Sequence, residues 1–214
     1  MASRHSYGPD ASQFGDLYEG GDGGVAVLIH GGFWRDRYDL TLMEPLARDL
    51  VAHGWTAWNI EYRRLGSGGG MPQTLDDVGA AIDHLAELEL DLGRVVAIGH
   101  SAGGHLAAWA AAREHARVPL TGYVSQAGVL DTPRALELNL SDGVAREFLD
   151  ASPIERPPHV PGLLVHGSRD DIVPLELSEA FARVTGAELQ VFDEDHFGPI
   201  DPENPMWKAV LAWL

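Results

Sequence analysis

The feature that most constrains the fold is an alternation between short apolar runs and segments with helical spacing. The segment 74–90 has the clearest helical spacing, with apolar residues three and four positions apart at Leu75, Val78, Ile82, Leu85 and Leu88. Six runs rich in Val, Ile and Leu alternate with such segments, at 25–29, 56–62, 95–98, 120–127, 162–165 and 187–192. Strands that are apolar throughout and alternate with helices predict a mostly parallel sheet covered by helices on both faces.

The remaining periodic segments complete an α/β pattern. They predict further helices over 40–53, 102–115, 175–184 and 204–214. Thr74, followed by Asp76 and Asp77, is a helix-start signature for the segment that begins at 74. With 214 residues and no repeat or linker, we expect one domain over 1–214. About 35 residues separate the runs at 120–127 and 162–165. They leave room for a short cap or crossover segment at about 128–160, and hence for a shallow, open pocket.

Charge and composition exclude several classes of function. The chain carries 32 acidic and 15 basic residues, a net charge of −17, which would repel nucleic acid and anionic membranes. It contains no cysteine, which excludes disulfides, thiolate catalysis and cysteine–zinc sites. No apolar run is long enough to cross a bilayer, and the first ten residues lack the apolar core of a secretory signal. We therefore expect a cytoplasmic protein that binds neither nucleic acid nor membrane.

Ser101 lies where the apolar run at 95–98 gives way to an alanine-rich helical segment. A serine at this point is either an ordinary helix N-cap or a nucleophile on a sharp strand-to-helix turn. Gly99 and Gly103 flank it in a G-x-S-x-G arrangement. The nucleophile turn needs small residues at these two positions because side chains there would collide, whereas an N-cap does not need them. The pattern therefore favours a nucleophile.

Two other chemical groups follow later strands, as expected if they assist Ser101. In parallel sheets, ligands bind beyond the carboxyl ends of the strands. After the run at 162–165 the chain carries Asp170 and Asp171, either of which could orient a histidine, and a solvated turn is the alternative. His196 lies directly after the run at 187–192 and is the candidate general base. The acids around it do not form a metal-ligand pattern, so we expect no metal.

The order of these groups along the chain, Ser then Asp then His, is that of the α/β-hydrolase fold and differs from the order in other serine-triad folds. The intermediate of acyl transfer also needs backbone donors for its oxyanion. Ala102 supplies one N–H at the start of the helix, and the turn after 25–29 supplies others at Gly32 and Phe33. Trp34 and His100 are candidates for the wall of the substrate pocket, although Trp34 could instead pack beneath its loop.

Four stretches carry a resemblance to a known superfamily: "HGGFW", "GHSAGGHLAAW", "SPIERPPHVPGLLVHGSRDDIVP" and "DHFGPIDP". Together they resemble the α/β-hydrolase superfamily, in particular the esterase branch that includes kynurenine formamidase (arylformamidase) and small carboxylesterases. The resemblance runs through nearly the whole chain. It implies Ser101 as nucleophile, His196 as base, oxyanion donors at Gly32 and Phe33, and Asp170 rather than Asp171 as the acid, from the pattern G-x-x-D-x-x-V-P.

The expected activity is therefore hydrolysis of a short-acyl ester or activated amide through an acyl-enzyme, by a carboxylesterase or an arylformamidase-like enzyme without a cofactor. The expected partner is a small-molecule ester or amide. A carbohydrate acetyl esterase or a peptidase of the same fold is the alternative within the class. A hydrolase-fold protein that only binds a ligand, or a lyase that uses the same three residues, is an alternative from another class. The sequence does not indicate an oligomeric state.

Overall fold

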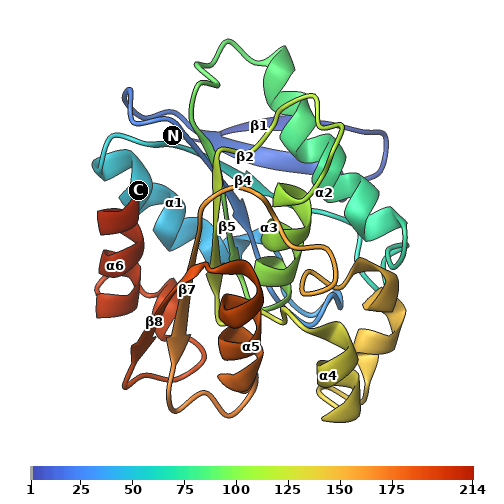
Figure 1. The fold of residues 1–214 in the computed structure, drawn as a ribbon. Helices are drawn as coiled ribbons and strands as arrows, with labels where there is room; N and C mark the ends of the chain where they lie inside the picture. The colour runs from blue at the N-terminus through green and yellow to red at the C-terminus, as the bar shows by residue number, and fades with distance from the viewer. Residues whose placement is uncertain (1) are drawn as a thin grey trace.

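The computed structural model describes residues 2–214 and has a single eight-stranded sheet at its centre (Figure 1). The strand order is β1-β2-β4-β3-β5-β6-β7-β8, and all neighbours from β4 to β8 pair in parallel. The strands are β1 (Ser3–Ser6), β2 (Phe14–Tyr18), β3 (Val25–Ile29), β4 (Thr56–Ile60), β5 (Val95–His100), β6 (Gly122–Gln126), β7 (Gly162–Gly167) and β8 (Glu188–Phe192).

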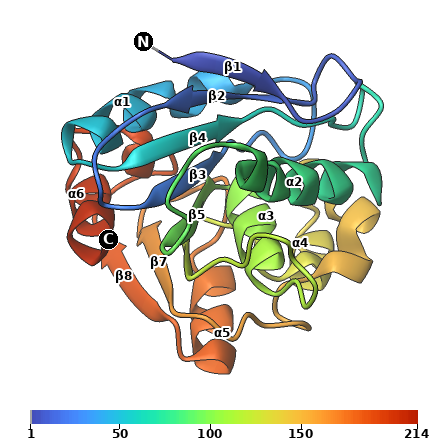
Figure 2. The same cartoon turned by 90° about the horizontal axis from the view of Figure 1, so that it is seen from above.

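Helices cover both faces of this sheet, as the alternating pattern predicts. The α-helices are α1 (Glu44–Ala52), α2 (Gln73–Asp83), α3 (Ala102–Ala111), α4 (Thr132–Glu137), α5 (Glu176–Thr185) and α6 (Pro205–Trp213). Helices α1 and α6 lie on one face, and α2, α3 and α5 lie on the other (Figure 2). The prediction of a mostly parallel sheet with two helical layers is confirmed.

The central strands are apolar at every position because alternate side chains enter two different cores. In β3, Val25, Val27 and Ile29 pack into the core on the side of α2 and α3, whereas Ala26 and Leu28 pack into the core on the side of α1 and α6. All five residues are buried. A strand between two helical layers therefore loses the apolar–polar alternation of a half-exposed strand.

The first two strands are absent from the sequence expectation. β2 pairs antiparallel with β4, and β1 pairs antiparallel with β2 at the edge of the sheet. β1 reads Ser-Arg-His-Ser and is largely exposed, so its sequence carries no apolar signal. Its position depends on pairing with β2, where Arg4 lies opposite Asp16 and forms a 2.7 Å ion pair with it. An edge strand of this kind is specified by its neighbour more than by its own composition.

The start of α2 is close to the prediction: the helix begins at Gln73, and Asp76 lies in its first turn. Pro72 occupies the cap position and no side chain caps the helix. Thr74 instead accepts a hydrogen bond from the Gly70 N–H and donates one to the Arg63 carbonyl. Asp77 is buried and binds Arg63 in an ion pair of 2.7 Å. The predicted helix 74–90 also ends early, because the chain tightens into a 3₁₀ helix over His84–Glu87.

The remaining boundaries differ in smaller ways. The predicted helix 40–53 is a 3₁₀ helix (Leu40–Met43) followed by α1. β8 is an edge strand with two exposed and three half-buried residues, so the expectation that this strand is apolar and fully covered is wrong. Between β6 and β7, the segment 128–160 contains α4 and a kinked 3₁₀ segment over Val144–Ala151.

Candidate active site

Ser101 occupies a strained turn between β5 and α3. Its φ of 56° and ψ of −118° lie outside the regions that residues with a Cβ normally adopt. Its side chain makes no capping hydrogen bond to the helix, although it stands at the N-cap position. The residue therefore does not perform the structural role that would account for an ordinary serine there.

The two flanking glycines are required by close contacts around this turn. A Cβ on Gly99 would lie 1.9 Å from the Gly103 carbonyl oxygen. A Cβ on Gly103 would lie 2.0 Å from the Ile29 carbonyl oxygen, so α3 begins in direct contact with the end of β3. Side chains at both positions would therefore collide with backbone, as the G-x-S-x-G pattern predicts. For Gly103 the collision is with a neighbouring strand.

His196 and Asp170 form a hydrogen-bonded pair at the ends of β8 and β7. The His196 Nδ1–H donates to Asp170 Oδ2 at 2.7 Å. Both side chains are buried, and the other Asp170 oxygen accepts from the Ile172 and Val173 N–H groups at 2.9 and 2.8 Å. Asp171, the other candidate, is exposed. This arrangement places the proton of His196 on Nδ1 and leaves Nε2 as the unprotonated nitrogen.

The environment of Asp170 keeps its carboxylate ionised. Burial alone would raise its pKa, but hydrogen bonds from His166 and His196 outweigh this effect and hold the pKa well below its usual value. The His166 Nε2 lies 3.3 Å from Asp170 Oδ2. A buried, charged acceptor of this kind can orient a histidine and stabilise its protonated form.

The loop after β3 lies directly against the Ser101 turn. A Cβ on Gly31 would lie 2.9 Å from the Ser101 Cβ, so this approach depends on glycine. The loop then turns through Gly32, Phe33 and Trp34, all with positive φ. The Arg35 N–H closes the turn by donating to the Gly32 carbonyl. The hydrogen bond that closes the turn therefore leaves the N–H groups of Gly32 and Phe33 unused. The Ala102 N–H stands in the first turn of α3, where helical N–H groups lack intrahelical acceptors.

A buried polar network supports this loop from below. The His30 ring contacts the Gly31 carbonyl through Nδ1 at 2.8 Å and the Glu61 carboxylate through Nε2 at 3.1 Å. Glu61 also pairs with Arg64 at 2.9 Å, and the Tyr62 hydroxyl donates to the His30 carbonyl at 2.7 Å. The position of the loop is therefore held by charge-assisted hydrogen bonds as well as by packing.

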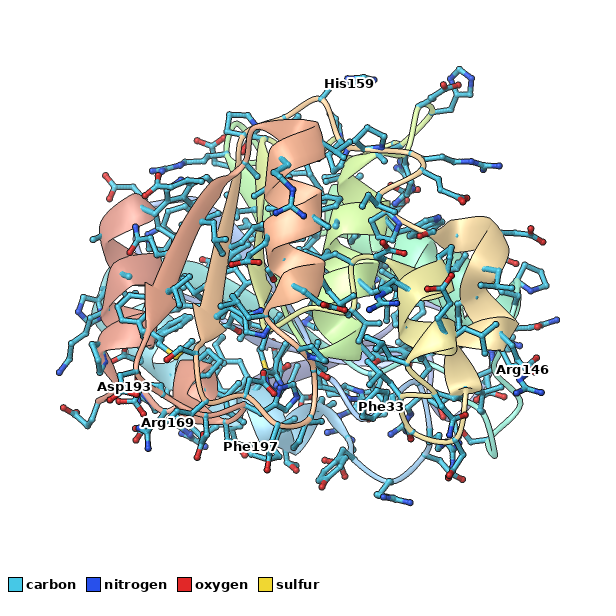
Figure 3. All side chains as sticks on the ribbon, turned by 60° about the horizontal axis from the view of Figure 1, so that its bottom comes forward. Phe33, Arg146, His159, Arg169, Asp193 and Phe197 are labelled. Atoms are coloured by element: carbon cyan, nitrogen blue, oxygen red, sulfur yellow. The ribbon has the colours of Figure 1, made fainter. Side chains whose placement is uncertain are left out.

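Ser101 and His196 line one cavity, which we call the Ser101 cavity. It has a volume of about 270 Å³ and is lined by Gly32, Phe33, Arg37, Tyr38, Leu42, His100, Ser101, Ser141, Ile172, His196 and Phe197. Phe33 and Phe197 lie at the same end of the molecule, and His159 lies at the opposite end (Figure 3). Among residues 2–214, the hydrogen bonds at this site include the His196–Asp170 pair but none between Ser101 and His196. Such contacts are often loose without substrate and tighten in its complex.

Trp34 is the predicted pocket residue that the structure places elsewhere. It is fully buried and does not line the Ser101 cavity. Its ring stacks on Phe148 with centroids 4.5 Å apart, and its Nε1–H donates to His105 Nδ1 at 3.2 Å. The prediction of a pocket wall is therefore wrong for Trp34, whose side chain packs in the core. The alternative, packing beneath the loop, is the observed one.

His100 and Gln126 hold the loop that carries His196. The His100 Nε2–H donates to the His196 carbonyl at 2.9 Å, and the Gln126 amide donates to the Pro199 carbonyl at 2.7 Å. The two residues are register partners at the ends of β5 and β6. Burial lowers the pKa of His100 to about 3, so its ring stays neutral.

The sequence interpretation did not single out Gln126, or His30 and His166. The signal was present for all three, because each is a polar residue at or next to the carboxyl end of a buried strand.

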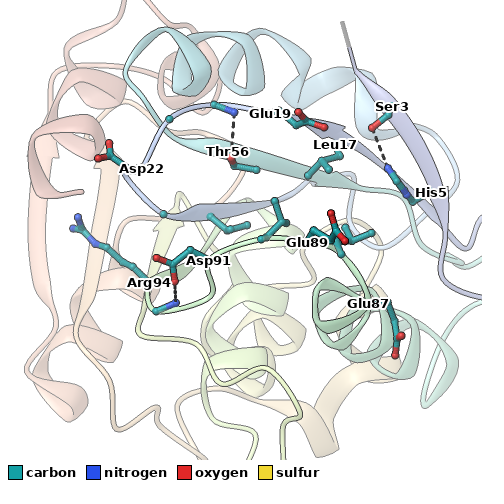
Figure 4. A pocket seen from close by; sticks show the side chains of 17 residues that line it. Ser3, His5, Leu17, Glu19, Asp22, Thr56, Glu87, Glu89, Asp91 and Arg94 are labelled. Atoms are coloured by element: carbon teal, nitrogen blue, oxygen red, sulfur yellow. Dashed lines mark hydrogen bonds between the residues drawn. The ribbon is translucent and has the colours of Figure 1, made fainter.

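A larger cavity lies at the opposite, amino-terminal ends of the strands. This acidic cavity has a volume of about 720 Å³, and its lining includes Glu19, Asp22, Glu87, Glu89 and Asp91 (Figure 4). Its walls come from the loop after β2 and from the segment that precedes β5. None of the sequence-predicted site residues lines it.

Two further searches bear on possible ligands and location. Within residues 2–214, no group of three or more His, Asp or Glu side chains is arranged to hold a metal ion. No helix in the described part of the chain combines the length and the apolar character needed to span a membrane.

The parallel sheet, its two helical layers and the strained serine between β5 and α3 define an α/β-hydrolase fold. A family model, BD-FAE, matches residues 18–140, more than half of the chain. The chain therefore belongs to the BD-FAE family. The match includes the loop after β3 and the Ser101 turn but ends before Asp170 and His196.

Comparisons with individual proteins find similarity to esterases. The chain is 27% identical to Esterase LipC of Mycobacterium tuberculosis over 82% of its own length and 52% of the relative's. It is 26% identical to the probable carboxylic ester hydrolase LipM of the same organism, over 78% and 46% of the two chains. The chain thus spans about half the length of the curated relatives it matches.

Solved structures support the fold over nearly the whole chain. A carbohydrate esterase from gut microbiota superimposes with a TM-score of 0.81 at 19% identity, covering 100% of this chain and 94% of the other. Esterase B from Lactobacillus rhamnosis superimposes with a TM-score of 0.80 at 18% identity, covering 99% and 84%. Esterase 2 of Thermogutta terrifontis gives 0.76 at 24% identity, covering 99% and 91%. At these identities the likeness concerns the fold alone.

Proposed function

We propose that this chain is a serine hydrolase that cleaves short-acyl esters or activated amides through an acyl-enzyme intermediate. The observation that carries the proposal is that the strained Ser101 lines one cavity with His196, which is hydrogen-bonded to the buried Asp170. The esterases among the similar proteins support the same chemistry. A protein that only binds a ligand would not need a serine freed from its capping role and a histidine oriented by a buried carboxylate.

In the proposed reaction, Ser101 Oγ attacks the substrate carbonyl and its proton passes to His196 Nε2. The resulting oxyanion is bound by the N–H groups of Gly32, Phe33 and Ala102, where each well-placed donor contributes roughly 10²–10³ in rate. His196 then gives the proton to the leaving alcohol or amine as the bond to the carbonyl carbon breaks. Water then attacks the carbonyl carbon of the acyl-enzyme while His196 takes its proton. The bond to Ser101 Oγ breaks, the proton returns to Oγ, and the carboxylic acid leaves. Asp170 holds His196 in the required tautomer throughout.

The size and rim of the cavity support small acyl groups. A volume of about 270 Å³ lies below the usual range for drug-sized ligands, roughly 300–1,000 Å³. The segment 128–160 acts as a short cap in this proposal, because Ser141 lines the cavity and its carbonyl accepts from the Arg35 side chain at 2.9 Å. Carboxylesterase and arylformamidase-like activities are the two variants we favour, and carbohydrate acetyl esterase activity is a third that the similar carbohydrate esterase supports.

Covalent labelling tests the nucleophile. We expect a fluorophosphonate probe to add to Ser101, as read by peptide mass spectrometry, and Ser101→Ala to lose both the adduct and hydrolysis of phenyl acetate. Ser141→Ala is the matched control, because Ser141 lines the same cavity. It should keep both. No adduct on Ser101 would support a binding protein, and residual hydrolysis by Ser101→Ala would mean that another group is the nucleophile.

Substrate preference tests the finer variants. The panel compares kcat/KM for p-nitrophenyl esters of increasing acyl length, N-formylkynurenine and an acetylated xyloside. We expect the p-nitrophenyl series to peak at acetyl or propionyl. A strong preference for N-formylkynurenine would select the formamidase variant, and a preference for the xyloside would select the carbohydrate esterase.

A further inference from the structure

The charge of the Ser101 cavity differs from that of the protein as a whole. The chain has 32 acidic residues against 15 basic ones, yet among residues 2–214 no aspartate or glutamate lines this cavity. Its single cationic side chain is Arg37, on the loop that leads from the Gly32–Phe33 turn toward α1. A cavity with a cation and without a carboxylate is suited to an anionic ligand.

Arg37 is also free of partners, which is uncommon in this chain. Eleven of the fourteen arginines donate to a carboxylate or a backbone carbonyl through their side chains. In the described residues, Arg37, Arg156 and Arg183 are those without such a hydrogen bond or ion pair. Arg156 and Arg183 do not line the Ser101 cavity, whereas Arg37 does.

The acids nearest to Arg37 in the sequence lie away from the Ser101 cavity. Asp39 accepts hydrogen bonds from the N–H and hydroxyl of Thr41 at the start of the 3₁₀ helix. The Asp36 carboxylate lies against Gly66, whose added Cβ would be 2.6 Å from it. Neither residue lines the Ser101 cavity. The guanidinium of Arg37 is therefore not neutralised by its own loop.

The apolar surface around Arg37 indicates what else the ligand carries. Tyr38 and Phe197 keep 42% and 43% of their surface exposed, and Phe33 is half-buried on the same cavity. These aromatic faces can cover a ring or a short apolar group beside the cation. Since the whole chain carries a charge of −17, an anionic substrate needs such a local cation to be held near Ser101.

We propose that Arg37 is a specificity-determining residue that binds a carboxylate of the substrate, so that the substrates are aromatic or other compact apolar esters with a negative charge near the scissile bond. This inference rests on the proposed function. Arg37 takes no part in the chemical step. It acts on kcat/KM by holding the anionic group while Ser101 and His196 act on the carbonyl.

A comparison of matched esters tests the proposal. Phenyl acetate and 3-acetoxybenzoate differ by a carboxylate in the leaving group, and methyl benzoate and monomethyl isophthalate differ by one in the acyl part. For at least one pair, we expect Arg37→Gln to lower kcat/KM of the anionic ester about tenfold, as for a lost charge-assisted hydrogen bond. The neutral ester should change less than about twofold, and Arg37→Lys should retain part of the preference because the charge remains.

The control variant is Arg156→Gln, which removes an equally unpartnered and exposed arginine far from the serine. It should leave all four rates unchanged. Raising the salt concentration to 0.5 M should reduce the anionic preference of the native enzyme but not of Arg37→Gln. Equal loss for neutral and anionic esters in both pairs, or no loss for either, would overturn the proposal.

The experiment distinguishes an error in the role of Arg37 from an error in the proposed serine hydrolase function. If Ser101 is not a nucleophile, all esters and the fluorophosphonate probe fail to react in the native protein. If only the role of Arg37 is wrong, the probe still labels Ser101 and both members of each ester pair respond alike to the substitution.

Discussion

The two ends of the sheet carry cavities with opposite character. The acidic cavity, at the amino ends of the strands, has a volume of about 720 Å³, and its five acids are all exposed. The Ser101 cavity, at the carboxyl ends, has a volume of about 270 Å³ and stands over buried polar groups that are hydrogen-bonded to one another. The larger cavity is therefore not the one with organised chemistry.

The difference between the two cavities shows at which end of a parallel sheet reactive side chains can be held in a fixed orientation. At the carboxyl ends the strands finish in buried polar residues. His100 and Gln126 are register partners that hold the loop after β8, and His166 contacts the segment after β7. At the amino ends, the acids of the acidic cavity all lie on connecting segments and their carboxylates face water. Burial is what makes a hydrogen bond or a charge strong enough to orient another group.

The largest expected effect is on kcat, and it should be confined to substitutions at the carboxyl ends of the strands. Asp170→Asn should lower kcat by roughly 10⁴, because His196 would lose its tautomer and its counter-charge. Asp171→Asn and, in the acidic cavity, Glu89→Gln should change kcat less than about threefold, as surface changes away from the site. Steady-state hydrolysis of phenyl acetate measures all three variants.

A comparable loss in Glu89→Gln would contradict the comparison, because the acidic cavity would then take part in the reaction. A loss in Asp171→Asn with none in Asp170→Asn would move the orienting role to the exposed aspartate. Circular dichroism of each variant checks that the fold is retained.

Glycine substitutions compare how tightly the two ends of the sheet are packed, through the free energy of unfolding. Gly103→Ala places a Cβ 2.0 Å from the Ile29 carbonyl, and we expect it to lower the free energy of unfolding by about 3 kcal/mol. Gly93→Ala, in the wall of the acidic cavity, meets only the Asp91 carboxylate at 3.2 Å and should cost less than about 1 kcal/mol. Urea unfolding measures both. Similar losses for the two variants would mean that the Ser101 turn is no more tightly packed than the opposite end.

Acid should weaken the end that contains the Ser101 cavity through its buried histidines. His105 accepts from Trp34 through Nδ1 and donates to the Ala151 carbonyl through Nε2, an arrangement that requires the neutral ring. Burial lowers its pKa to about 4, whereas the unfolded chain binds the proton below roughly pH 6.5. The stability from the neutral ring is therefore complete above pH 6.5 and is lost as the pH falls toward 4.

We expect His105→Gln to reduce the slope of unfolding free energy against pH by about 1.4 kcal/mol per pH unit between pH 6.5 and 4.5. His159→Gln, which alters an exposed histidine at the opposite end of the molecule, should leave that slope unchanged. Urea unfolding at several pH values gives the slopes. An unchanged slope in His105→Gln would show that this histidine is already protonated in the folded protein.

The smallest expected effect concerns the acidic cavity. Its carboxylates repel one another, so the double variant Glu19→Gln and Glu89→Gln should raise the melting temperature by a few degrees at low salt. The gain should vanish in 0.5 M salt because exposed charges are screened there. A fall in melting temperature at low salt would instead indicate that these acids form stabilising contacts.

The sequence predicted the layered fold and the segments that carry the site because these depend on local patterns. Runs such as 25–29 and 95–98 are apolar at every position only when both faces of a strand are covered. Gly99 excludes a Cβ because of the Gly103 carbonyl, which lies only four residues further along the chain, so this requirement is local. The pairing of β1 with β2, by contrast, was not predicted, because an exposed edge strand has no pattern of its own.

Only the tertiary structure decided which groups meet. Asp170 and Asp171 are adjacent in sequence, and only the resemblance to a family preferred Asp170. The hydrogen bond that joins Asp170 to His196 exists only in the folded chain. Trp34 was a candidate for the pocket wall, with packing beneath its loop as the alternative, and its contacts with Phe148 and His105 decide for the alternative. The freedom of Arg37 likewise depends on where Asp36 and Asp39 point. Periodicity and steric exclusion act on neighbouring residues and can be read from them, whereas contacts between distant segments exist only once the chain has folded.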